Sequence, residues 1–215
     1  MSNNDLLGTL SIAIALVAYG IYIWQIVRRG LVVPHPFSWL LWALVTSVAF
    51  FAQLARSAGP GSWVTGLTAV VCGLISGLAL GWHGWRFSRL DWAALCVGLC
   101  VFGYYVVTRD PEKSAVLATL VDVVGYYPTV RKGWADPVSE SRASFALNGL
   151  KFAPALLAME SFSVATSLYP LTILIANLGV ATTLAARRRA LRVPGSKPAS
   201  RGPSGSSGTA KATAA

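Results

Sequence analysis

Charged and metal-ligating residues are scarce in this chain. Only 12% of the 215 residues are charged, and there are two histidines and three cysteines. His35 and His83 have no companion Cys, Glu or His at the spacing of metal ligands, and no glycine-rich phosphate loop is found. Cys72, Cys96 and Cys100 fall within apolar runs, so we expect buried thiols and no disulfide framework. We therefore expect neither an enzyme nor a bound metal or cofactor.

Apolar residues, by contrast, dominate the chain. Hydrophobic residues make up 54% of the sequence, and its mean hydropathy is +0.58. A single soluble core in a chain of this length cannot bury so much apolar surface, which predicts a membrane protein. Seven apolar runs predict an all-α integral membrane fold with seven transmembrane helices. The runs span residues 6–27, 37–55, 63–82, 92–107, 114–130, 144–159 and 163–186.

The formal net charge of +10 is distributed unevenly between the runs. If the N-terminus lies outside, only Arg56, Arg109 and Lys113 fall outside, and most other basic residues fall in cytoplasmic loops and the tail. This asymmetry predicts a bacterial-type inner membrane protein with a cytoplasmic C-terminus. It also favours the lipid bilayer, and not nucleic acid, as the partner of the basic residues. Residues 191–215 are rich in Pro, Gly, Ser and Ala and predict a disordered cytoplasmic tail.

One segment appears twice. Residues 22–39 and 126–144 each contain an aromatic-rich break, then basic residues, then Pro and Ser before the next apolar run. This duplication predicts two three-helix repeats, at 1–90 and 113–190. A linker helix within 91–112 adds one crossing, so the repeats are expected to be parallel and related by an axis along the membrane normal.

A stripe of small residues lies in the third apolar run. Gly73, Gly77 and Gly81 are spaced four residues apart. This spacing predicts close helix packing, either within the bundle or between two copies in a homo-oligomer.

The second copy of the duplicated segment resembles the signature of the PQ-loop proteins. Pro128 and Thr129 stand where that signature has a Pro-Gln pair, basic residues follow, and 139–144 resembles its entry to the next helix. The first copy has Trp24 and Gln25 at the matching place. The layout of the chain up to its tail is similar to that of the PQ-loop and SWEET superfamily, closest to uncharacterised bacterial members.

This resemblance implies a membrane transporter that moves a small polar solute, such as a sugar, an amino acid or a vitamin, by alternating access between the repeats. It implies a hinge at Pro128, with a static kink as the alternative. It also implies a solute site lined by Trp42, Asn148 and Asn177, although these amides are equally suited to hydrogen bonds between helices. A non-transporting receptor, chaperone or scaffold of the same fold is the other function that remains open.

Two charged residues fall inside apolar runs. Asp122 lies in the middle of the fifth run, and Lys151 lies within the sixth. A charge at membrane depth costs about 3 kcal/mol, so both side chains are expected to face the interior, and the simplest hypothesis is that they pair. Asp122 is then a proton-binding or cation-coupling site controlled by Lys151, or the pair only fixes the helices. Alternatively, Lys151 extends to the cytoplasmic interface.

Overall fold

The computed structural model describes residues 1–29, 34–81, 87–137 and 141–191, which are helical apart from short connections. The predicted all-α fold is confirmed for these residues. The helices are α1 (Asn3–Arg29), α2 (Pro36–Ala55), the 3-10 helix η1 (Gly59–Ser62), α3 (Trp63–Leu80), α4 (Arg89–Thr108), α5 (Pro111–Ala135), α6 (Arg142–Leu150), α7 (Phe152–Leu157) and α8 (Val164–Leu191). Nearly all of the expected tail, 192–215, lies outside the described residues.

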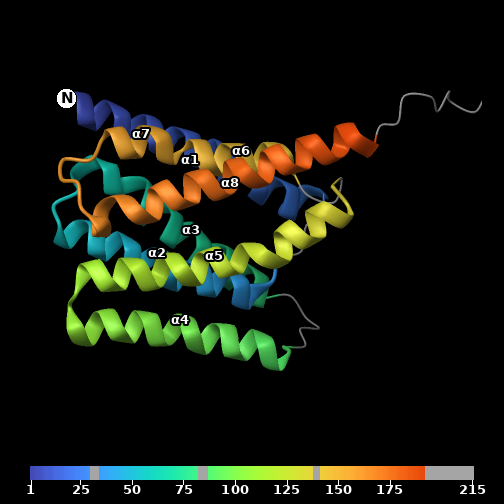
Figure 1. Cartoon of the computed structure of the whole chain (residues 1–215), viewed down its shortest axis with the longest axis horizontal. Helices are drawn as coiled ribbons and strands as arrows, with labels where there is room; N and C mark the ends of the chain where they lie inside the picture. The colour runs from blue at the N-terminus through green and yellow to red at the C-terminus, as the bar shows by residue number, and fades with distance from the viewer. Residues whose placement is uncertain (30–33, 82–86, 138–140, 192–215) are drawn as a thin grey trace, which may run out of the picture.

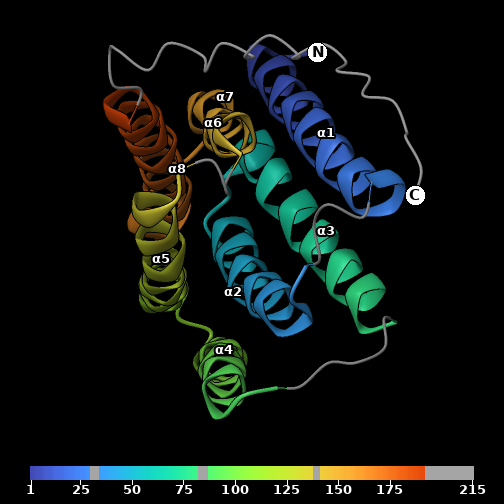
Figure 2. The same ribbon diagram turned by 90° about the vertical axis from the view of Figure 1, so that its right-hand side faces the viewer.

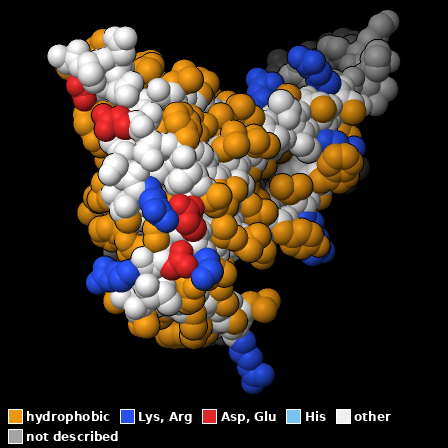
Figure 3. Space-filling model, turned by 60° about the vertical axis from the view of Figure 1, so that its left-hand side comes forward, with side chains coloured by type: hydrophobic (Ala, Val, Ile, Leu, Met, Phe, Trp, Pro, Cys, Tyr) orange, Lys and Arg blue, Asp and Glu red, His pale blue; other side chains and the backbone are white. Residues whose placement is uncertain are grey.

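Five segments are long and apolar enough to cross a membrane, namely α1, α2, α3 together with η1, α4 and α8. They present large hydrophobic side chains outward, among them Leu16, Val70, Leu99 and Ile175. Figure 3 shows apolar side chains over much of the face that it draws, with the acidic side chains confined to small areas. The chain is therefore a multi-pass membrane protein, as predicted.

The fifth and sixth predicted crossings differ from the others. The 25-residue helix α5 is long enough to cross, but it holds Asp122 near its middle and charged residues near both ends. The sixth run is divided at Lys151 into α6 and α7, which follow one another in line (Figure 1). Pro154 explains this division, because a proline ring clashes with the carbonyl four positions earlier, here that of Leu150. The prediction of one uninterrupted helix over the sixth apolar run is therefore wrong.

The helices other than α4 form a ring, which Figure 2 shows obliquely from one end. In the first group, α3 packs between α1 and α2; in the second group, α8 packs between α5 and the segment formed by α6 and α7. The groups meet where α1 contacts α6 and α7, and where α2 contacts α5. Helix α4 lies outside the ring against α2 and α5. Side chains that point into the ring are consequently enclosed by both groups.

Polar residues determine where several helices begin. At the start of α4, Ser88 Oγ accepts a hydrogen bond from the Asp91 N–H, and the Asp91 carboxylate accepts one from the Ser88 N–H. This reciprocal cap lets α4 begin ahead of its apolar run. At the start of α6, Ser141 Oγ accepts a hydrogen bond from the Ser144 N–H.

The packing of α3 and α4 corrects two expectations. Cys72 is buried, but Cys96 and Cys100 are exposed, because α4 packs mainly against α2 and α5 and leaves its other faces uncovered. The expectation of three buried thiols is therefore wrong for α4. A Cβ at Gly73 or Gly77 would meet nothing within 4 Å. These two glycines are therefore not needed for close packing between helices of the described bundle. Packing between two copies stays a prediction.

One end of the bundle, here called the N-terminal end, is where α1, α3, α5 and α8 begin (Figure 1). At this end Arg56 Nε lies 3.0 Å from Glu112 Oε1, and Glu112 Oε2 accepts a hydrogen bond from the Ala165 N–H at 2.7 Å. The Glu160 N–H also donates to the Ala58 carbonyl at 3.1 Å. Glu112 thus ties the end of α2, in the first group, to the start of α8, in the second.

Replacing Glu112 with glutamine is expected to lower the melting temperature of the purified protein by about 2–4 °C, corresponding to about 1 kcal/mol. The change removes the charge that attracts Arg56 and weakens the bond to the α8 backbone. Asp110→Asn is the matched control. The Asp110 carboxylate accepts a hydrogen bond from the Lys113 N–H, which holds its pKa below the ordinary value, and asparagine caps a helix about as well. Equal losses in the two variants would contradict the bridging role of Glu112.

Candidate functional site

Lys151, at the junction of α6 and α7, points into the ring and is only 2% exposed. Its Nζ donates hydrogen bonds to Tyr19 Oη at 2.7 Å, Thr68 Oγ1 at 3.1 Å and Asn148 Oδ1 at 3.2 Å. The ammonium also lies 4.4 Å from the centre of the Tyr19 ring and 5.1 Å from that of Phe152. All three of its N–H donors are therefore used by neutral oxygens from α1, α3 and α6. The alternative in which Lys151 extends to the interface is wrong.

The backbone at Lys151 is fixed as well. Ser11 Oγ, on α1 and fully buried, donates a hydrogen bond of 2.6 Å to the Lys151 carbonyl. This contact joins the first group to the helix division that Pro154 produces. The position of the ammonium is consequently set by both its side-chain partners and its main chain.

Asp122, on α5, is 5% exposed and also faces the ring. Its carboxylate interacts with the side chains of Tyr169 on α8 and Trp42 on α2. The Tyr169 hydroxyl is hydrogen-bonded to Thr46 Oγ1 at 2.9 Å, and Trp42 Nε1 lies 3.6 Å from the place of a Cβ at Gly125, one turn from Asp122. The acid is therefore surrounded by neutral polar groups from both helix groups.

Asp122 and Lys151 do not form the ion pair that their sequence positions suggested. No ion pair within the part of the chain that the structure describes joins them, although the two charges interact through space. The physical reason is that each charge already has neutral partners, which hold the two apart inside one polar cluster.

The other expected site residues divide into two sets. Asn177 is 4% exposed, and its Nδ2 donates to Tyr126 Oη at 2.6 Å and to the Ile173 carbonyl at 2.9 Å. Together with Trp42 and Asn148, it lies on the ring-facing side of its helix. Trp24 is 47% exposed and lies on the outer side of α1. The side chains of Gln25, Pro128 and Thr129 lie outside the described residues, so the hinge stays a prediction.

The sequence analysis missed the hydroxyl groups that surround the two charges. Tyr19, Tyr126, Tyr169, Thr46 and Thr68 all belong to this cluster. The sequence pattern could have predicted one of them. Tyr126 follows Asp122 by four residues and therefore lies on the same face of the helix. Tyr19 and Thr68 carry no such local signal, because their partner Lys151 is far away in the sequence.

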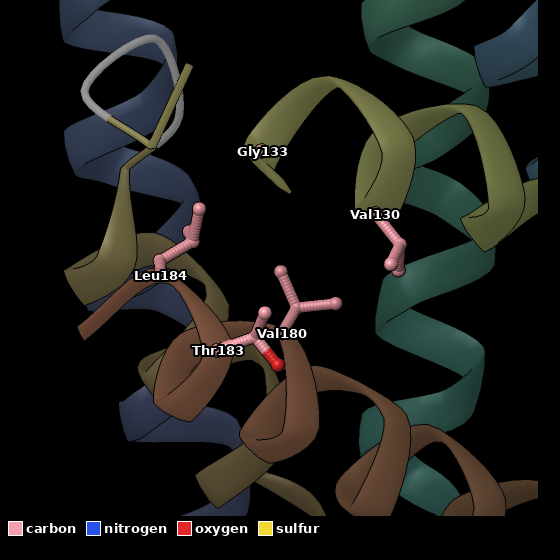
Figure 4. A pocket seen from close by; sticks show the side chains of 5 residues that line it. All are labelled: Val130, Gly133, Val180, Thr183 and Leu184. Atoms are coloured by element: carbon pink, nitrogen blue, oxygen red, sulfur yellow. The ribbon is translucent and has the colours of Figure 1, made fainter. Parts of the chain in front are cut away.

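A separate, shallow crevice lies near the ends of α5 and α8. It is lined by Val130, Gly133, Val180, Thr183 and Leu184 (Figure 4). A Cβ at Gly133 would come within 2.8 Å of Leu184 Cδ2, which shows how closely the two helices approach there. Beyond it, Arg187 donates to the Trp134 carbonyl and its guanidinium lies 4.6 Å from the centre of the Trp134 ring. The crevice is almost entirely apolar and is distinct from the polar cluster.

No known protein family, curated protein or solved structure matches the chain. Within the described ranges, no group of three or more His, Cys, Asp or Glu side chains is arranged to hold a metal ion. The site must therefore be interpreted from its own chemistry. It offers one ammonium, one carboxylate, several hydroxyls and amides, and aromatic faces.

Proposed function

We propose that the chain is a membrane carrier that moves a small polar solute by alternating access between its two helix groups. The observation that carries this proposal is the buried polar cluster, because both groups contribute to it. The first group supplies Tyr19, Trp42 and Thr68, and the second supplies Asp122 and Lys151. Charged groups in the middle of a membrane protein are expensive and typically mark a solute or ion pathway.

The arrangement of the helices supports two parallel three-helix repeats. In each group the third segment lies between the first two, and the contacts between groups are reciprocal. The first segment of each group meets the second segment of the other, as a twofold axis along the membrane normal requires. In this scheme α5 is the fifth crossing, α6 and α7 together are the sixth, and α4 is the linker.

Apart from the contacts of the polar cluster, described polar contacts also join the two groups at the N-terminal end. They include the bridge from Arg56 through Glu112 to Ala165, and a bond from Gln53 Nε2 to the Thr166 carbonyl at 3.1 Å. At the opposite, arginine-rich end, Arg187 instead binds α5 of its own group. These contacts favour a form closed at the N-terminal end. By the positive-inside rule, the arginine-rich end is cytoplasmic in a bacterial-type inner membrane.

Uptake by proteoliposomes tests the proposal. The probes are pooled labelled sugars, amino acids and vitamins, and the comparison is wild type, Asp122→Asn and the surface control Asp110→Asn. We expect saturable uptake by wild type and the control, and a loss of about 100-fold in Asp122→Asn, since that change removes a buried charge from the pathway.

The state of the protein decides how a negative result is interpreted. Wild-type protein that stays monodisperse and helical in liposomes but moves nothing from the whole panel contradicts the carrier. Such a result favours the receptor, chaperone or scaffold of the same fold. Equal uptake by Asp122→Asn and wild type would show that the polar cluster is not part of the solute pathway.

A further inference from the structure

We infer that the transported solute is a small zwitterion, with a carboxylate that binds Lys151 and a primary ammonium that binds Asp122. This inference rests on the proposed carrier function and specifies its substrate class. Among the described residues, Asp122 and Lys151 are the charged side chains that are buried. They have opposite signs and face the same ring, and no ion pair within the described residues joins them.

The separation of the two charges is the first argument. A purely structural pair in a low-dielectric interior needs direct contact, because only close Coulomb attraction offsets the desolvation of both ions. Here Lys151 is instead bound by Tyr19, Thr68 and Asn148, and Asp122 by neutral groups of Tyr169 and Trp42. The cluster therefore presents a cation and an anion whose partners are neutral and can be exchanged.

The identity of those partners is the second argument. Tyr19 Oη and Asn148 Oδ1 act as acceptors for the lysine, as the oxygens of a solute carboxylate would. A carboxylate binds an ammonium more strongly than a neutral oxygen does, because the hydrogen bond is charge-assisted. At the other charge, a solute ammonium can donate charge-assisted hydrogen bonds to Asp122 in place of its neutral donors.

Charge balance is the third argument. A solute with only an ammonium would bring a second cation into the ring beside Lys151, and a solute with only a carboxylate would bring a second anion beside Asp122. A sugar satisfies hydroxyl and amide partners but leaves both charges without an ionic partner. A zwitterion gives each charge a counterion and leaves the net charge of the ring unchanged, which keeps the desolvation penalty lowest.

Competition by matched small molecules tests the inference on the wild-type protein. The competitors are L-alanine, its decarboxylated analogue ethylamine, its deaminated analogue propionate, and glucose. Each is added to the purified protein in detergent during thermal unfolding, and to proteoliposomes during uptake of labelled alanine. We expect alanine to raise the melting temperature and to compete for uptake at least about tenfold better than the other three, since they lack one or both charges.

Single-charge variants sharpen the test. Asp122→Asn should lose its preference for alanine over propionate, and Lys151→Met should lose its preference for alanine over ethylamine. Asp110→Asn, at the surface, should keep both preferences. Because the wild-type competition needs no variant, misfolding of Lys151→Met does not weaken the test.

The outcomes separate this inference from the carrier proposal. Transport of glucose or ethylamine without transport or binding of alanine and other zwitterions overturns the inference and leaves the carrier intact. Stabilisation by zwitterions without transport supports the binding site and contradicts the carrier. A folded protein that no zwitterion stabilises, and that transports none, overturns the inference.

Discussion

Replacement of Lys151 by methionine is expected to lower the free energy of unfolding by about 3 kcal/mol and to abolish uptake. Methionine has nearly the length of lysine, so the loss arises from chemistry rather than from an empty cavity. Three acceptors, on Tyr19, Thr68 and Asn148, lose their donor, and Asp122 becomes the one buried charge of the described residues. Chemical or thermal unfolding in detergent measures the effect.

A double-mutant cycle separates the two charges from the rest of the cluster. Asp122→Asn combined with Lys151→Met restores charge balance, so the double variant should be less unstable than the sum of the single losses by about 1–3 kcal/mol. Uptake should not recover, because neither charge remains for a solute. Lys113→Met is the matched control, since the Lys113 side chain is 73% exposed. Additive losses in the cycle would show that the two charges are energetically independent.

Most of the fold could be predicted from the sequence because apolar runs of membrane length are a strong signal. α1, α2, α3, α4 and α8 follow such runs closely. The division of the sixth run could not be read from hydropathy, since Pro154 is compatible with an apolar run and acts only through backbone geometry. The exposure of Cys96 and Cys100 likewise depends on where α4 packs, which no local pattern determines.

The candidate site could be predicted in part. Because burying a charge in a membrane is costly, Asp122 and Lys151 were correctly predicted to face the interior. Their separation was missed because it depends on hydroxyl groups from distant helices, such as Tyr19 and Thr68. The expectation for Trp24 came from alignment of the two motif copies. Its exposure on α1 could not be predicted in this way, because a matched motif position does not say which face of a helix packs inward.

The close contact between α6 and α8 leads to the prediction of a second large loss of stability. At Gly149, an added Cβ would lie 3.0 Å from Asn177 Cβ and 3.1 Å from the Leu174 carbonyl oxygen. A leucine there must push α6 away from α8, because a backbone carbonyl cannot rotate aside. We expect Gly149→Leu to lower the free energy of unfolding by about 3 kcal/mol. Uptake should also fall, since the displaced helix carries Asn148 and leads into Lys151.

Gly73→Leu is the control for this change, because it makes the same substitution in a helix where nothing lies within 4 Å of the added Cβ. Leucine favours the helix over glycine by about 0.5–1 kcal/mol, so Gly73→Leu should unfold at the same or a higher temperature. Size-exclusion chromatography adds a second readout. A stable Gly73→Leu variant that turns from dimer to monomer would place the Gly73 and Gly77 face between two copies.

If Gly149→Leu were as stable and active as wild type, the prediction would be contradicted. Close packing of α6 on α8 would then not be what holds Asn148 and Lys151 in the ring.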